Sequence, residues 1–136
     1  MSQIPYQVEV KKSSIAEGNG VFALCDYKKN DVIEICPAIF LPMREFEDFK
    51  RSKMYYYFFE YTHKEFAVVL GYGSIYNHSY KPNAQYRFNF RKRVMVVRAI
   101  KKIRLGDEIF FNYNFWSSDK TPLESWYQAG VDSNHL

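Results

Sequence analysis

The sequence predicts a single, mainly β domain, and three observations support this prediction. The chain has 136 residues, which is enough for one hydrophobic core and too few for two cores of ordinary size. Aromatic residues make up 19% of it, with 12 Tyr, 12 Phe and 2 Trp, and such side chains favour pleated, half-buried surfaces. Short apolar runs alternate with turn residues, and only one segment carries good helix signals. The 47% hydrophobic and 25% charged content excludes a disordered chain, so we treat residues 1–136 as one domain.

The first part of the chain predicts strands joined by tight turns. Residues 6–11 alternate apolar and polar side chains, which is typical of a half-buried strand. Gly18, Asn19 and Gly20 tolerate positive φ and predict a turn before the apolar run 21–25. The polar residues 28–31 predict a second turn, which leads into the apolar run 32–40.

The middle of the chain predicts a short helix and then a strand pair. Phe46, Phe49 and Lys53 are spaced among charged residues in a way that allows a helix around residues 44–53. The runs 54–61 and 66–70, interrupted at His63 and Lys64, predict two strands.

The last part predicts a hairpin, a strand and a helix. Residues 84–90 alternate and residues 94–99 are strongly strand-forming, so Arg91 and Lys92 lie at a hairpin tip. A turn at 105–107 leads into the apolar strand 108–113. Residues 121–130 begin with Thr, Pro, Leu and Glu and end at Gly, which predicts a helix of about two turns.

Charge and targeting signals narrow the class of protein. The N-terminus has no basic flank followed by an apolar run, and the uncharged stretch 66–80 is too short to span a bilayer, so we expect a soluble, intracellular protein. Cys25 and Cys36 are expected to be reduced, and no residue spacing predicts a metal site. Between residues 81 and 104 the chain carries basic side chains and no acidic ones, either as a solvent-facing hairpin or as a surface for an acidic partner.

Three segments carry the candidate chemistry. They are Gly18–Ala23, Asn77–Ser79 with Pro82 and Asn83 downstream, and Glu108–Tyr113. Each is weak alone, because a Gly-x-Gly is usually only a turn and a tyrosine that ends an apolar strand is usually a core residue. In this order and spacing, however, they resemble the glycine pair, the Asn-His-Ser motif and the Glu-Leu-x-Phe-Asp-Tyr-like strand of SET-domain protein lysine methyltransferases.

The resemblance spans nearly the whole chain and is greatest to the compact, single-domain viral members of that family. It implies a fold of several small β-sheets with a knot-like C-terminal threading and one or two short helices, an exception to the usual unknotted topology. It also implies an S-adenosylmethionine-dependent protein-lysine N-methyltransferase. Histone tails are the expected substrate, with ribosomal or other basic proteins as the alternative, and more than one methyl group is expected to be added.

Cofactor residues are implied by the same resemblance. The loop Gly18, Asn19 and Gly20 would approach S-adenosylmethionine through its backbone, where a Cβ would collide with the cofactor. Asn77 would bind the methionine end of the cofactor, and His78 would meet its adenine through the backbone. Trp116, or failing that Trp126, would cover the adenine.

The substrate lysine channel is implied in the same way. Tyr113 corresponds to the catalytic tyrosine, Phe111 to the position that helps set the number of methyl groups, and Tyr57 to a channel-lining tyrosine. A narrow aromatic channel excludes water and holds the alkyl stem of a lysine, while tyrosine hydroxyls orient its amine.

The sequence also departs from the family pattern. Asn112 stands where the family usually has aspartate, and Tyr80 where many members have cysteine. A zinc-binding cysteine cluster is missing downstream, so the channel would be closed by Phe115, Trp116 and residues 121–130.

Two function classes remain open from the sequence. The first is the methyltransferase, with a lysine-bearing protein as partner and a homodimer as the expected assembly. The second is a non-catalytic binding module of the same fold that uses the basic segment 81–104 to hold nucleic acid or an acidic protein. The sequence does not distinguish a nuclear from a cytoplasmic location.

Overall fold

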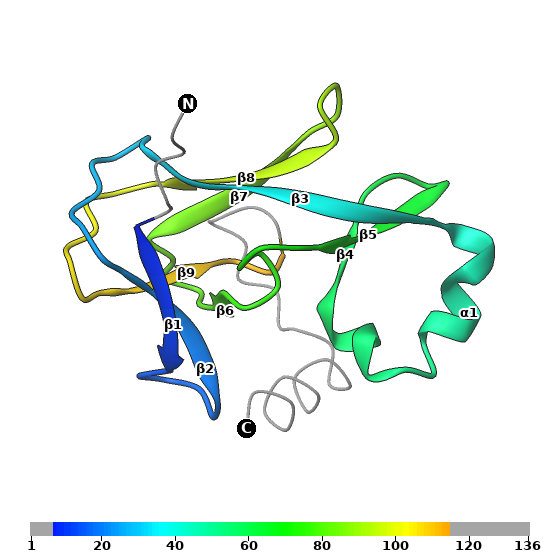
Figure 1. Ribbon diagram of the computed structural model, residues 1–136, viewed down its shortest axis with the longest axis horizontal. Helices are drawn as coiled ribbons and strands as arrows, with labels where there is room; N and C mark the ends of the chain where they lie inside the picture. The colour runs from blue at the N-terminus through cyan, green and yellow to red at the C-terminus, as the bar shows by residue number, and fades with distance from the viewer. Residues whose placement is uncertain (1–6, 115–136) are drawn as a thin grey trace, which may run out of the picture.

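A computed structural model of the chain describes residues 7–114, and these residues form a mainly β structure with two sheets (Figure 1). The four-stranded sheet has the order β1-β2-β9-β6, with β1 at Val8–Lys12, β2 at Asn19–Ala23, β6 at Asn77–His78 and β9 at Glu108–Phe111. The five-stranded sheet has the order β4-β5-β3-β8-β7, with β3 at Val32–Pro42, β4 at Phe58–Glu60, β5 at Glu65–Val69, β7 at Ala84–Asn89 and β8 at Val94–Ala99. The prediction of a mainly β fold with small sheets is therefore confirmed.

The predicted turns occur where the sequence places them. Gly18 has φ of 92° and its carbonyl accepts a hydrogen bond from the Ser13 amide, which closes the β1–β2 hairpin. At the β7–β8 tip, Arg93 has positive φ and the Asn89 side chain accepts the Lys92 amide, so the predicted hairpin tip is confirmed. Helical turns link β3 to β4 through η1 at Met43–Glu45, α1 at Phe46–Phe49 and η2 at Lys53–Tyr57.

One predicted strand is wrong over its first half. Residues 54–57 belong to the 3-10 helix η2, and the strand β4 begins only at Phe58. The Tyr55 amide donates to the Ser52 carbonyl, and the Tyr55 ring stacks on Phe58 at 5.7 Å. Periodicity could not separate these alternatives, because an apolar run of this length suits either structure once its rings find a packing surface.

Side chains from both sheets form one hydrophobic core. Val21 and Ile109 come from the four-stranded sheet and Met95 and Val97 from the five-stranded sheet, and all four are fully buried. Cys36 is buried in this core, and it and the half-buried Cys25 are free thiols, as the sequence predicts.

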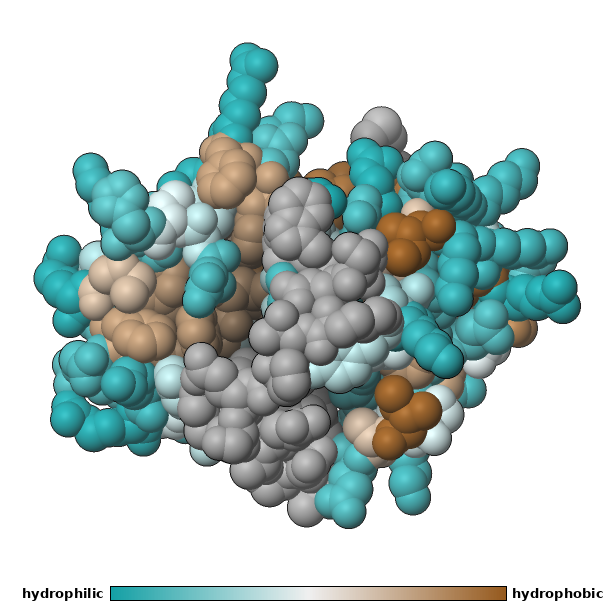
Figure 2. Space-filling view, turned by 180° about the vertical axis from the view of Figure 1, so that it is seen from behind, coloured by the Kyte–Doolittle hydropathy of each residue, from teal (hydrophilic) through white to brown (hydrophobic). Residues whose placement is uncertain are grey.

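A smaller aromatic cluster joins α1 and η2 to β4 and β5. Phe46 packs against Tyr55, Phe58 and Phe66 with ring centroids 5.2 to 5.9 Å apart. Viewed from behind, apolar side chains gather on this half of the molecule, on the left of Figure 2. The cluster holds η2 in place, and η2 carries one of the tyrosines expected at the functional site.

The sequence predictions for Trp116, Trp126, Phe115 and the helix 121–130 lie outside the described residues. Within residues 7–114, no helix is both long and apolar enough to cross a membrane.

Candidate active site

Asn77 is the point at which the three motif segments meet. Its Nδ2 donates to the Asn19 carbonyl and to Glu108 Oε2, each at 2.9 Å. Asn77 also pairs with Phe110 in the parallel β6–β9 ladder. The glycine segment, the Asn-His-Ser segment and the C-terminal strand are therefore joined through one buried amide that is 2% exposed.

Asn83, from the downstream Pro-Asn pair, forms hydrogen bonds with the main chain of β9. Its Nδ2 donates to the Glu108 carbonyl, and its Oδ1 accepts the Phe110 amide, each at 2.8 Å. These two bonds join the Pro-Asn segment to the main chain of β9.

Glu108 is a buried carboxylate that the sequence analysis did not single out. It accepts hydrogen bonds from the Ser13 hydroxyl, from the amide and hydroxyl of Ser14, and from Asn77, at 2.7 to 3.0 Å. Burying an ionised carboxylate is costly unless several donors surround it, and these donors meet that need. A charged residue at the start of the apolar strand 108–113 is the sequence signal that would have found it.

Position 20 must be glycine because the side chains of Glu108 and Asn77 leave no room for a Cβ. A Cβ at this position would lie 2.2 Å from Glu108 Oε2 and 2.9 Å from Asn77 Nδ2. The resemblance implies that the Gly18–Gly20 loop needs glycine because of the cofactor, whereas in the structure Gly20 is required by Glu108 and Asn77, and Gly18 has a positive φ.

A small pocket brings together the two tyrosines expected in the lysine channel. Tyr57 reaches it from η2 and Tyr113 from the residues that follow β9. Its lining, which we call the tyrosine pocket, consists of Tyr56, Tyr57, Phe59, Gly73, Ser74, Tyr76 and Tyr113. Partial burial raises the pKa of the Tyr57 hydroxyl, so this group stays protonated at neutral pH and can donate a hydrogen bond.

Tyr113 is held by main-chain and side-chain contacts with the Asn-His-Ser segment. Its hydroxyl donates to the Tyr76 carbonyl at 2.6 Å, and its amide donates to His78 Nδ1 at 3.0 Å. The His78 ring lies 5.2 Å from the Tyr113 ring. The His78 side chain thus positions Tyr113, a role that the sequence analysis did not assign to it.

Phe111 lies behind the pocket and is not part of its lining. It is fully buried, and its ring centroid is 4.9 Å from Tyr86, 5.2 Å from Tyr76 and 5.9 Å from Tyr113. A substitution at Phe111 would therefore reach the pocket through the rings of Tyr76 and Tyr113.

Glu34 is a second buried carboxylate that the sequence analysis missed. It accepts the Tyr76 hydroxyl at 2.7 Å and the Tyr72 amide at 2.9 Å, and it is 1% exposed. Its position in the middle of the apolar run 32–40 is the signal that could have identified it.

Comparison with known proteins assigns the family. The family model for the SET domain matches residues 18–114, which contain every motif segment described above. The chain belongs to the SET-domain family.

Two relatives cover most of this SET domain. A Schizosaccharomyces pombe histone-lysine N-methyltransferase, specific for H3 lysine 37, is 25% identical over 112 residues, covering 80% of this chain and 76% of the relative. The crystal structure of a Plasmodium falciparum protein, a candidate histone methyltransferase, is 33% identical, with a TM-score of 0.67, and the match covers 81% of this chain and 95% of that one.

A third structure supports the fold alone. A PRC2 complex bound to S-adenosylmethionine is 21% identical, with a TM-score of 0.69, over 81% of this chain and 15% of the other. The predicted SET fold is confirmed by these comparisons, and the resemblance to compact viral members stays a prediction.

Within the described part of the chain, no three His, Cys, Asp or Glu side chains lie close enough together to hold a metal ion.

Proposed function

We propose that this SET domain is a protein-lysine N-methyltransferase that uses S-adenosylmethionine. The observation that carries the proposal is the Tyr76–Asn77 pair. The Tyr76 carbonyl holds the hydroxyl of Tyr113 in the tyrosine pocket, and the next residue presents a buried amide on β6. A lysine site and a cofactor site are thus adjacent along one segment of main chain.

The hydrogen bonds of Asn77 leave it able to bind the amino-acid part of S-adenosylmethionine. Both Nδ2 hydrogens of Asn77 are used by Asn19 and Glu108, while its buried Oδ1 accepts no hydrogen bond from any described residue. A buried oxygen that accepts no hydrogen bond is costly unless a ligand supplies a donor. The ammonium group in the methionine part of S-adenosylmethionine is a suitable donor. S-adenosylmethionine supplies an activated methyl group when bound. We propose that Gly18, Asn19, Gly20, Asn77 and His78 hold it, with Trp116 over the adenine.

The tyrosine pocket suits the stem and amine of a lysine. Tyr57, Phe59 and Tyr113 supply ring faces for the alkyl chain, and the tyrosine hydroxyls can orient the nitrogen. A free lysine has a pKa of about 10.4, so presenting it unprotonated near pH 7 costs roughly 4 to 5 kcal/mol. A channel that excludes water and ends beside a sulfonium would lower this cost, with Tyr113 aligning the amine.

We propose histone tails as the substrate, with more than one methyl group added. The support is that the fission yeast relative is a histone-lysine N-methyltransferase and that the Plasmodium protein is a candidate histone methyltransferase. In addition, the buried residue Phe111 carries no hydroxyl. A radiolabelled methyl-transfer assay against core histones and a whole-cell lysate, followed by mass spectrometry of the labelled band, tests both statements. If the label appears on a different protein, the methyltransferase activity is supported and the histone substrate is rejected.

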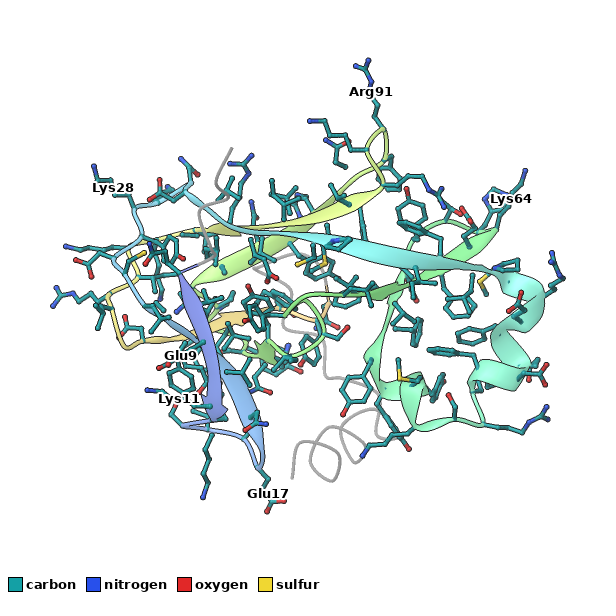
Figure 3. The ribbon with its side chains drawn as sticks, in the orientation of Figure 1. Glu9, Lys11, Glu17, Lys28, Lys64 and Arg91 are labelled. Carbon is teal, nitrogen blue, oxygen red and sulfur yellow. The ribbon has the colours of Figure 1, made fainter. Side chains whose placement is uncertain are left out.

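The basic side chains of the segment 81–104 include residues at both ends of the β7–β8 hairpin. Arg91 projects from the β7–β8 tip (Figure 3), and Arg93 there pairs with Glu65 at 3.1 Å. Lys101 and Lys102 follow β8, at its other end. The alternative of a binding module for nucleic acid or an acidic protein is tested by calorimetry, because a pure binder need not take up S-adenosylmethionine.

We also propose that the protein forms a homodimer. Ile39 on β3 and Val32 at its start are 53% and 39% exposed, which leaves apolar surface on the five-stranded sheet. Light scattering at micromolar concentration tests this, and a monomer would reject it.

A further inference from the structure

The Tyr76–Asn77 pair is held between two buried carboxylates, one on each side. The Tyr76 hydroxyl donates to Glu34 Oε1 at 2.7 Å, and the Asn77 side chain donates to Glu108 Oε2 at 2.9 Å. Successive side chains of an extended segment point in opposite directions, so the two residues can reach opposite partners. Glu34 lies on β3 of one sheet and Glu108 on β9 of the other.

Glu34 acts on the main chain that orients Tyr113. Its Oε2 accepts the Tyr72 amide, and a Cβ at Gly71 would lie 2.6 Å from the same oxygen, so the segment 71–76 is closely fitted around this carboxylate. Burial, with Glu34 adjacent, raises the pKa of the Tyr76 hydroxyl well above its usual value, which keeps this group protonated and donating. The carbonyl of the same residue accepts the Tyr113 hydroxyl.

Glu108 acts on the orientation of the Asn77 amide. Its other contacts are with Ser13 and Ser14, which come from the segment after β1 and hold the carboxylate in one place. With Glu108 and Asn19 both accepting from Nδ2, Asn77 has only its Oδ1 left for a ligand. The carboxylate therefore determines that Asn77 accepts and does not donate.

We propose that Glu34 and Glu108 are two positioning residues of the proposed methyl transfer and that they act on different steps. Glu108 sets cofactor affinity through Asn77, whereas Glu34 sets turnover through Tyr76 and the Tyr113 hydroxyl. This inference rests on the proposed function.

Glu108→Gln keeps the size of the side chain and changes its hydrogen-bonding character. Ser14 donates both its amide and its hydroxyl to Oε1, so the new carbonyl oxygen remains there and the new NH₂ faces Asn77. Two NH₂ groups then oppose each other, and rotating the Asn77 amide to relieve this would point its oxygen at the Asn19 carbonyl. Either outcome weakens the presentation of Oδ1 to an ammonium group.

Glu34→Gln and Tyr76→Phe disturb the other side. The first removes the carboxylate that accepts from two donors, and the second removes the hydroxyl that reaches it while keeping the ring. Both changes loosen the Tyr76 carbonyl and leave Asn77 with its partners Asn19 and Glu108.

The experiment compares the two Glu→Gln variants with each other and with Glu47→Gln, an exposed glutamate on α1. Calorimetry measures the affinity for S-adenosylhomocysteine, and steady-state kinetics at saturating cofactor measures kcat. Glu108→Gln is expected to weaken binding about tenfold or more, the loss expected when a hydrogen bond to a charged group is removed, with kcat nearly unchanged. Glu34→Gln and Tyr76→Phe are expected to lower kcat about tenfold with binding nearly unchanged.

A second ligand separates positioning from simple loss of structure. Methylthioadenosine lacks the amino-acid group, so Glu108→Gln should bind it as the unchanged protein does. The inference would be overturned if Glu108→Gln lost the same affinity for both ligands. It would also be overturned if Glu34→Gln and Glu108→Gln changed affinity and kcat in the same way, since both glutamates would then have only a structural role.

Thermal unfolding identifies a variant that does not fold. If Glu108→Gln is such a variant, Ser14→Ala removes one donor to the carboxylate and should show the same ligand selectivity in weaker form. An unchanged protein that binds no S-adenosylhomocysteine and transfers no methyl group would overturn the proposed function itself, and the inference with it.

Discussion

The Tyr113 hydroxyl donates a hydrogen bond to the main-chain carbonyl of Tyr76, with 2.6 Å between the two oxygens. The two residues are 37 positions apart, and the residue after Tyr76 is Asn77. The tyrosine pocket and the amide network around Asn77 are therefore joined at two consecutive residues, and substitutions on either side of this pair are expected to separate their roles.

We expect Asn77→Ala to weaken binding of S-adenosylmethionine by about 1.5 to 3 kcal/mol, because a buried acceptor for a charged group is removed. Isothermal titration calorimetry measures the affinity and the stoichiometry, which should be one site per chain for the unchanged protein. Asn89→Ala, at the β7–β8 tip, is a matched control that should bind normally. Ordinary affinity in Asn77→Ala would reject the cofactor assignment.

Tyr113→Phe should lower turnover at least about tenfold while folding and cofactor affinity stay nearly unchanged, since only the hydroxyl that aligns the amine is lost. Tyr61→Phe is the control, because Tyr61 packs between Phe40 and Phe88 and does not line the tyrosine pocket. Single-turnover methyl transfer measures the difference. Unchanged turnover in Tyr113→Phe would show that another tyrosine performs this role.

Phe111→Tyr should shift the product toward monomethyl-lysine and spare the first transfer. The added hydroxyl would enter the packed rings of Tyr76, Tyr86 and Tyr113, and the displaced rings of Tyr76 and Tyr113 would narrow the space in which a methylated amine must rotate. Mass spectrometry of saturated reactions gives the distribution, with thermal unfolding as the check on packing. A protein that stops at one methyl group before any substitution, or an unchanged distribution after it, would contradict this prediction.

Gly20→Ala should destabilise the protein by about 1 to 3 kcal/mol, the usual effect of overpacking, and should also weaken cofactor binding. Its Cβ would meet Glu108, which cannot swing away without breaking its bonds to Ser13 and Ser14. Gly106→Ala is the control, because Gly106 has φ of 93° and open space around its Cβ position. Gly106→Ala should lower the free energy of unfolding through backbone strain and leave cofactor affinity intact. Equal affinity in both variants would count against the network around Asn77.

Stability should decline at alkaline pH. Burial raises the pKa of the Tyr76 and Tyr86 hydroxyls above their usual value of about 10. The folded state then holds protons that the unfolded state releases, so the contribution of these groups is complete below about pH 10 and is lost as the pH rises further. Each group lowers the free energy of unfolding by about 1.4 kcal/mol per pH unit in that range.

Urea denaturation between neutral and strongly alkaline pH measures this slope. Tyr86→Phe removes one ionisable group and should make the decline less steep by about one group's share. An identical slope in Tyr86→Phe would show that Tyr86 is not protected from ionisation in the folded state.

The sequence by itself determined most of the strands and the turns between them. Alternation along residues 84–89 and the apolar run of β8 predict a hairpin locally, and positive φ at Gly18 and Gly106 occurs where the sequence offers glycine. The order and spacing of the three motif segments also determined the family, which the SET-domain match over residues 18–114 confirms.

The tertiary structure decided which side chains meet. Glu34 and Tyr76 are 42 residues apart, and Asn77 and Glu108 are 31 apart, so no local pattern could pair them. The two-residue strand β6 is too short for alternation to reveal, and it forms because β9 lies beside it. Both carboxylates are buried only because donors from distant segments compensate for their desolvation, and those donors come together only when the chain folds.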